Sequence, residues 1–306
     1  MRVGVLILPE RRWADSVALW QEAESLGFDS AWTYDHLSWR GLQNGPWFSA
    51  FPVLTAAACS TTQIKVGTLV TSPNFRHPVT LAKDAIALDD ISGGRFVLGI
   101  GAGSPDAGDA NVMTKEVLQP TDRAARFAEF VEFIDDLLRL PTTTREGRFF
   151  AAYEARTIPG CLSRPRLPLA LAATGPQGLR LAATHADAWV TAGPARWADG
   201  FTPAECLQAV AEQVRRLSRA CAESTRDIAT LERVFVVTDT AGGFLASPDN
   251  FLRLAESYAA IGITYLVLHW PRAEGIFAAD KAIFRKIAEM ALPIVRTFGG
   301  TDRPSI

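Results

Sequence analysis

The chain has 306 residues, 48% of them hydrophobic, and a formal net charge of −2 at pH 7. It is long enough to bury a large core, either as one large α/β domain or as two smaller ones. It carries no dense run of Lys or Arg and no apolar run of membrane-spanning length, so it lacks the usual signatures of nucleic-acid and membrane binding. We therefore expect a cytoplasmic protein whose partner is a small molecule.

The first part of the chain alternates strand-like and helix-like patterns. An apolar run at 3–8 predicts a strand, and apolar residues at helical spacing predict a helix over 13–26. A short aromatic strand is expected at 28–34, followed by a glycine-containing loop over 37–46 and a second helix over 47–59. Each of these strands is thus followed by one helix.

Residues 65–104 contain the clearest supersecondary pattern. Two apolar runs at 65–71 and 95–100 lack the alternation of half-buried strands, and an amphipathic segment over 77–91 joins them. Strands buried on both faces and joined by a helix form a right-handed parallel βαβ unit. Both runs end in small or polar residues, and parallel α/β proteins bind ligands at the carboxyl ends of their strands. We expect the functional site at these strand ends.

The second half of the chain resumes the alternation after one interruption. A helix is predicted over 121–140, with the Thr121 hydroxyl as its cap. The pattern breaks over about 141–168, where several prolines predict a hairpin-like insertion. Beyond it, strands are expected at 169–173, 187–192, 231–238 and 263–269, and helices at 174–185, 202–222, 247–262 and 277–290.

About eight strand and helix pairs in strict alternation, without a dividing linker, match one (β/α)8 barrel in number and length. We therefore predict a single TIM-like barrel domain over residues 1–306, with the insertion after its fourth helix. A doubly wound parallel sheet is the alternative fold.

The predicted strand ends bring chemically useful side chains to one face of the barrel. His36 follows a strand directly, beside Asp35 and three residues before Trp39, which places a proton-exchanging imidazole next to an aromatic surface. A structural histidine that caps a loop would give the same pattern. The four histidines lack metal-ligand spacing and the four cysteines form no CxxC pair, so no metal site is expected.

Two glycine-containing segments are candidates for binding a cofactor phosphate. Residues 99–103 (GIGAG) miss the dinucleotide fingerprint because the last glycine comes one place early and no helix follows at once. Residues 174–178 (TGPQG) end a strand at a predicted helix N-terminus, where free amides and the helix dipole favour a phosphate. An ordinary strand-to-helix turn is the alternative for this second segment.

Three blocks in order along the chain resemble the luciferase-like flavin and deazaflavin oxidoreductases. They are WTYDH at 32–36, GTLVTSPNFRHPVTLAKDAIALDDISGGRFVLGIGAG at 67–103 and ATGPQGLRLAATHADAW at 173–189. The resemblance covers nearly the whole chain and is closer to the branch that uses the deazaflavin coenzyme F420. It implies a TIM-like barrel, a cofactor at the carboxyl face with its phosphate near the fifth strand, and a homodimer.

The resemblance also implies roles for individual residues. His36 and Trp39 would lie beside the hydride-transfer face, and Asp35 would lie near the pyrimidine edge of the deazaflavin and act on His36. A bulge at Leu69 and Val70, often with a non-prolyl cis peptide, would back the ring. The other contacts would come from Ser72, Gly103 and Ser104 to the hydroxylated chain, and from Ala173, Thr174, Gly175 and Pro176 to the phosphate.

Ser104 departs from the family pattern. In the F420-dependent sugar-phosphate dehydrogenases a glutamate follows the equivalent glycine and serves as an acid group, whereas this chain has serine there. The departure argues against sugar-phosphate oxidation. It leaves His36 as the expected proton partner and makes the Ser104 hydroxyl a further candidate catalytic group.

The resulting interpretation is an F420-dependent oxidoreductase that transfers a hydride between the deazaflavin C5 and a C=C, C=N or C=O group of a small substrate. The alternative enzyme is an FMN-dependent monooxygenase that uses reduced flavin and oxygen, and a non-catalytic flavin- or deazaflavin-binding protein is the other alternative. The excess of arginine over lysine is expected of a GC-rich, actinobacterial genome, where F420 is common.

Overall fold

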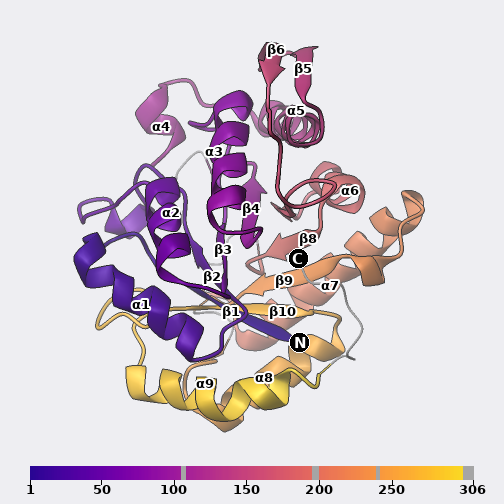
Figure 1. Cartoon of the computed structure of the whole chain (residues 1–306). Coiled ribbons are helices and arrows are strands. Elements are labelled where there is room, and N and C mark those ends of the chain that lie inside the picture. The colour runs from indigo at the N-terminus through magenta and orange to yellow at the C-terminus, as the bar shows by residue number, and fades with distance from the viewer. Residues whose placement is uncertain (105–107, 195–199, 239–241, 299–306) are drawn as a thin grey trace.

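A parallel barrel forms the centre of the molecule (Figure 1). The computed structural model describes residues 1–104, 108–194, 200–238 and 242–298. Within these ranges, neighbouring strands pair in the closed order β1-β10-β9-β8-β7-β4-β3-β2. The barrel strands are β1 (Arg2–Leu6), β2 (Ser30–Thr33), β3 (Lys65–Thr68), β4 (Phe96–Gly101), β7 (Leu169–Ala172), β8 (Ala188–Thr191), β9 (Glu232–Val236) and β10 (Tyr265–His269). The predicted barrel is confirmed, and its closure excludes the doubly wound sheet.

Helices follow the strands and surround the barrel (Figure 1). They are α1 (Trp13–Ser25), α2 (Ala50–Ser60), α3 (Pro78–Ile91), α4 (Ala110–Met113), α5 (Pro120–Arg139), α6 (Pro176–His185), α7 (Pro203–Glu223), α8 (Pro248–Ala260) and α9 (Lys281–Val295). Side chains cap the N-termini of some of these helices. Thr202 and Glu205 form a reciprocal capping box at the start of α7, and Ser247 caps α8, because each satisfies amides that the first helical turn leaves without partners.

The barrel interior is filled by side chains. A cluster inside the strands includes Trp32, Val97, Val234 and Tyr265, all at most 2% exposed. Trp32 occupies space that neighbouring strands leave open, since a Cβ atom at Gly67 would lie 2.5 Å from its ring. A second, larger cluster packs the outer strand faces against the helices. The barrel therefore has a packed interior and holds the loops at its strand ends in fixed positions.

The insertion between α5 and β7 contains an antiparallel hairpin, as predicted. Its strands are β5 (Thr142–Glu146) and β6 (Ala151–Arg156). The carboxylate of Glu129 on α5 accepts hydrogen bonds from the backbone amides of residues 148–150 at 2.7–2.9 Å. This carboxylate ties the turn of the hairpin to α5, beside which the hairpin projects in Figure 1.

Two local predictions differ from the structure. The α5 helix begins at Pro120 with Gln119 in the cap position, so Thr121 lies inside the first turn and is not the cap. Proline is well suited to the first helical position because its missing N–H would have no partner there. The short helix α4, between Ser104 and Pro120, was not among the helices predicted from the sequence. Its single turn is too short to produce a recognisable hydrophobic period.

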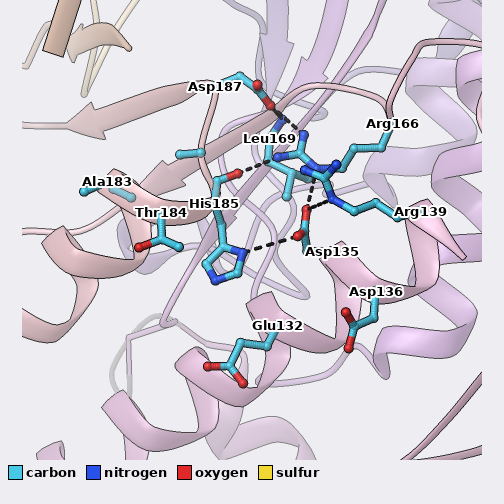
Figure 2. A network of polar contacts seen from close by, with 12 residues as sticks. Glu132, Asp135, Asp136, Arg139, Arg166, Leu169, Ala183, Thr184, His185 and Asp187 are labelled. Atoms are coloured by element: carbon cyan, nitrogen blue, oxygen red, sulfur yellow. Dashed lines mark hydrogen bonds and ion pairs between the residues drawn. The ribbon is translucent and has the colours of Figure 1, made fainter. Parts of the chain in front are cut away.

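A network of charges joins the amino ends of β7 and β8 to α5 (Figure 2). Arg166, which precedes β7, contacts Asp135 on α5 and Asp187 before β8, each at 2.6 Å. Arg139 and the ring of His185 also contact Asp135, at 3.0 and 3.3 Å. Although partial burial alone would raise it, the hydrogen bonds from His185 and Arg166 hold the pKa of Asp135 well below its usual range. This network fixes the end of the barrel opposite the strand carboxyl ends.

Among the described helices, none combines the length and the apolar character that crossing a bilayer requires.

Candidate active site

A cavity of about 910 Å³ opens at the carboxyl ends of the barrel strands. Its walls come from the ends of β2, β3, β4, β7, β8 and β9 and from the first turns of α5 and α6. It is large enough for a cofactor together with a small substrate. The predicted site residues that line it are His36, Leu69, Val70, Ser72, Gly103, Ser104, Ala173, Thr174, Gly175 and Pro176.

His36 faces the cavity and is held by an acid that sequence reasoning missed. Its Nδ1 atom lies 2.6 Å from Oδ2 of Asp109, and the other carboxylate oxygen of Asp109 accepts the amide of Leu37 at 2.7 Å. Asp109 is fully buried. Because a carboxylate only accepts, Nδ1 carries the hydrogen of this bond, which leaves Nε2 as the atom available for proton exchange with a ligand.

Asp35 has a different place from the one expected. Its carboxylate accepts hydrogen bonds from Nε and Nη2 of Arg76, at 3.0 and 2.7 Å, and from the Thr71 hydroxyl at 2.6 Å. It is 1% exposed and does not line the cavity. The hydrogen-bond partners of Asp35 are thus Arg76 and Thr71, while the acid bonded to His36 is Asp109, since neighbouring residues of an extended segment point to opposite sides. Its role here is to bind the segment after β2 to the segment after β3.

Trp39 also lies outside the cavity wall, although it was expected beside the hydride-transfer face. It is 4% exposed and packs between Tyr34, Trp47 and Phe277, with ring centroids 5.4–6.4 Å apart. An indole gains more by burying its whole surface among aromatic rings than by lining an open cavity. Trp39 therefore supports Tyr34, which does line the cavity.

Tyr34 forms a hydrogen bond to a buried histidine behind it. Its hydroxyl lies 2.8 Å from Nε2 of His269, whose Nδ1 lies 3.0 Å from the Val237 carbonyl. A carbonyl only accepts, so Nδ1 of His269 is protonated and Nε2 accepts the Tyr34 hydrogen. Burial lowers the pKa of His269 to about 3, which keeps the ring neutral. Tyr34 thus has its hydroxyl hydrogen directed away from the cavity.

The middle of the cavity is lined by backbone and small side chains. The peptide bond between Leu69 and Val70 is cis, as the resemblance implied, and both residues line the cavity. Gly103 has a φ of +75°, and a Cβ atom there would lie 2.4 Å from the Asn74 amide. Glycine is therefore needed both for the turn and for the close approach of Asn74. Asn74 in turn donates to the Ser104 carbonyl at 3.1 Å.

The far end of the cavity carries groups that suit an anion. Gly175 occupies the cap position of α6 without a side-chain hydrogen bond, so the first amides of this helix have no capping group. Arg123 on α5 and Arg180 on α6 also line the cavity. A helix N-terminus with nearby guanidinium groups provides hydrogen-bond donors and positive potential for a phosphate.

The remaining histidines lie outside the cavity lining. His77 accepts the amide of Val79 and caps α3, and His185 is the last residue of α6, as the sequence indicated. No group of three or more His, Cys, Asp or Glu side chains in the described ranges is arranged to hold a metal ion.

The fold and cavity define a protein of the parallel-barrel class, with a histidine, His36, in the wall of a cavity at the carboxyl ends of the strands. The sequence pattern of the luciferase-like monooxygenase family matches residues 1–242. The chain belongs to this family.

Two relatives and one solved structure are similar to this chain. An F420-dependent glucose-6-phosphate dehydrogenase of Beutenbergia cavernae is 30% identical, over 90% of this chain and 91% of that protein. A 4-hydroxyprotoasukamycin monooxygenase of Streptomyces nodosus subsp. asukaensis is 33% identical, over 58% of this chain and 48% of that protein. The solved structure of an F420-dependent secondary alcohol dehydrogenase with an F420-acetone adduct superimposes with a TM-score of 0.77 at 18% identity, covering 94% of this chain and 98% of that chain.

Proposed function

We propose that the protein is an F420-dependent oxidoreductase that transfers a hydride between the deazaflavin C5 and a small organic substrate. The observation that carries this proposal is the position of His36, at the wall of a cofactor-sized cavity and bound to the buried carboxylate of Asp109. Similarity to an F420-dependent dehydrogenase over nine-tenths of both chains supports the choice of cofactor.

The residues present suit this cofactor. Leu69 and Val70 offer an apolar backing for a flat ring, and Ser72 and Ser104 offer hydroxyl groups along the cavity. The uncapped N-terminus of α6 and the guanidinium of Arg180 would hold the phosphate. When bound, the deazaflavin supplies or accepts a hydride at C5.

His36 performs the proton transfer in this proposal. Asp109 holds the hydrogen on Nδ1, so Nε2 can take the proton of a substrate hydroxyl or return one to a carbonyl oxygen. The orientation of the ring is fixed before substrate arrives because Asp109 is itself held by the Leu37 amide. The protein thus supplies position and a proton relay, and the cofactor supplies the redox chemistry.

Ser104 limits the substrates that we propose. It lines the cavity where the sugar-phosphate dehydrogenases of the family carry an acid. A hydroxyl cannot replace a carboxylic acid as a proton donor at neutral pH. We propose that the substrate is not a sugar phosphate, despite the similarity to a glucose-6-phosphate dehydrogenase.

A fluorescence titration of the apo-protein with F420 and with FMN tests the cofactor. We expect F420 to bind at least about tenfold more tightly, a difference of about 1.4 kcal/mol. Equal or tighter binding of FMN would overturn the assignment. It would favour the FMN-dependent monooxygenase, to which the similarity with a named monooxygenase also points, and oxygen consumption with reduced FMN would then be observed.

We also propose a homodimer in which α2 and α3 pack between subunits. Their larger apolar side chains, such as Phe51, Leu54 and Ile86, are buried within the subunit, while Pro52 and Ala87 are exposed on the outer surface. Small exposed residues allow helices of two subunits to approach closely. Light scattering at micromolar concentration tests the proposal, and a monomeric mass would exclude it.

A further inference from the structure

A second cavity, of about 310 Å³, lies beside the first. It is bounded by α5, by the segment around α4, and by Phe149 and Phe150 at the turn of the hairpin. Arg123 and Arg126 both line it, and Arg123 also lines the main cavity. The two cavities therefore share Arg123 as a lining residue.

Arg123 and Arg126 stand one helical turn apart on α5, and neither forms an ion pair with a carboxylate in the part of the chain that the structure describes. Nη2 of Arg126 donates to Oδ1 of Asn74 at 2.5 Å, while its buried Nε has no hydrogen-bond partner. Burial and the charge of Arg123 lower the pKa of Arg126. Within the described residues, two partly buried like charges thus lie together without a carboxylate partner.

Other arginines near α5 are neutralised by carboxylates. Arg145 contacts Asp136 and Glu132, and Arg148 contacts Asp122 at 2.7 Å. The helix therefore provides carboxylates for the arginines that secure the hairpin and none for Arg123 and Arg126. Glu116 is the carboxylate that lines the second cavity among the described residues, and it is exposed. The local balance remains positive.

The missing counter-ion is expected to come from a ligand. Leaving a buried N–H of a guanidinium, such as Nε of Arg126, without an acceptor costs free energy. A carboxylate or phosphate would form short, charge-assisted hydrogen bonds to such a group. Phe149 and Phe150 restrict the access of water to one side of the cavity, which strengthens such a contact. The ligand must present its anionic group next to Arg123, which lines both cavities.

We propose that the cavity of Arg123 and Arg126 binds the carboxylates of the oligoglutamyl tail of F420. This inference rests on the proposed cofactor. The α5 helix packs against α6, whose N-terminus would hold the phosphate, so a chain that continues beyond the phosphate meets Arg123 and then Arg126. FMN ends at its phosphate and cannot reach this cavity. The arginine pair is thereby a determinant of cofactor choice, separate from the ring and from the catalytic histidine.

The test measures affinity for three cofactors by fluorescence in the absence of substrate. They are F420 with a long glutamyl tail, the tail-free deazaflavin that ends at the lactyl phosphate, and FMN. The variants are Arg123→Gln and Arg126→Gln, with Arg219→Gln as control, since Arg219 is 71% exposed on α7. Thermal unfolding verifies that each variant folds.

We expect each cavity variant to weaken binding of long-tailed F420 about tenfold, equal to about 1.4 kcal/mol. Arg126→Gln should keep the wild-type affinity for the tail-free form, because Arg126 lines the second cavity and not the main one, and high ionic strength should reduce the loss for the long-tailed form. The control should bind all three cofactors like the wild type. An equal loss for the long-tailed and tail-free forms in Arg126→Gln would assign Arg126 to the phosphate and overturn the proposal.

Two further outcomes distinguish failure of this inference from failure of the proposed function. If wild-type protein binds both deazaflavins tightly and with equal affinity, and the variants do the same, the tail site is wrong while F420 remains the cofactor. If wild-type protein binds neither deazaflavin, both proposals fail together.

Discussion

Nδ1 of His36 lies 2.6 Å from Oδ2 of Asp109, a residue 73 positions further along the chain. The bond fixes which nitrogen of the ring carries the hydrogen. Replacing Asp109 with Asn removes the charge and allows an amide N–H to face the ring, so we expect turnover to fall on the order of 10²-fold. Steady-state kinetics should place the loss in kcat, with the dissociation constant of the cofactor unchanged.

The variant Asp109→Glu provides the matched control for this prediction. It keeps the carboxylate and changes only its reach, so it should retain more activity than Asp109→Asn. Turnover of Asp109→Asn at the wild-type rate would show that Asp109 serves only the backbone of Leu37.

The substitution His36→Ala separates a catalytic histidine from a structural one. The His36 side chain is 16% exposed and lines the cavity, so its loss leaves no closed void in the core. We expect a melting temperature within a few degrees of wild type, cofactor affinity near normal, and turnover lower by about two orders of magnitude. A correctly folded variant with wild-type turnover would make Ser104 or a bound water the next candidate for the proton transfer.

The bond from Tyr34 to His269 predicts a stability effect. Tyr34→Phe leaves Nε2 of the buried His269 without its donor, which should cost about 1–3 kcal/mol in the free energy of unfolding. Tyr153→Phe is the control, because the Tyr153 hydroxyl donates to Glu146 on the exposed hairpin and its loss should be nearly neutral. Urea denaturation measures both, and equal effects would contradict the prediction.

His269 should make stability depend on pH in the mildly acidic range. Its folded-state pKa is lowered by burial to about 3, while the unfolded chain binds the proton near pH 6.5. Between these values the unfolded state holds the extra proton, so the unfolding free energy falls as pH falls, by up to about 1.4 kcal/mol per pH unit. In His269→Gln the slope over this range should be smaller, and an unchanged slope would reject the assignment.

Asp135 should make the free energy of unfolding depend on pH in a more acidic range than His269 does. Its carboxylate has a lowered pKa in the folded state through His185 and Arg166, so it stabilises the fold above its ordinary pKa, near 4. This stabilisation is lost as pH falls further, because protonation then favours the unfolded chain. Asp135→Asn should be less stable than wild type at neutral pH and should lose less stability below about pH 4. Chemical denaturation over a pH series measures the difference.

The barrel could be predicted from the sequence because strands buried on both faces and helices with one apolar face leave distinct periods. The position of His36 could be predicted for the same reason, since it lies in the segment just after β2, which ends at Thr33. The contacts of Asp35 and Trp39 could not, because adjacency along the chain does not say on which side a side chain points. Asp35 turns to Arg76, and Trp39 turns into the aromatic cluster.

The acid that holds His36 could not be predicted for another reason. Asp109 belongs to a loop without a hydrophobic period, and its contact with His36 forms only when the ends of β2 and β4 come together in the barrel. An acid in the loop after a barrel strand was the only available signal. The pair formed by Arg123 and Arg126 was equally hidden, because on a helix surface two arginines usually have solvent or carboxylates as partners.

Arg166 secures β7 and β8 at their starting residues, while the catalytic cavity uses the opposite ends of the same strands. A lineage that carries this barrel can therefore exchange the loops that select a substrate without disturbing the contacts that hold the strands in register. Relatives with unlike substrates and a shared scaffold are the expected result of that separation.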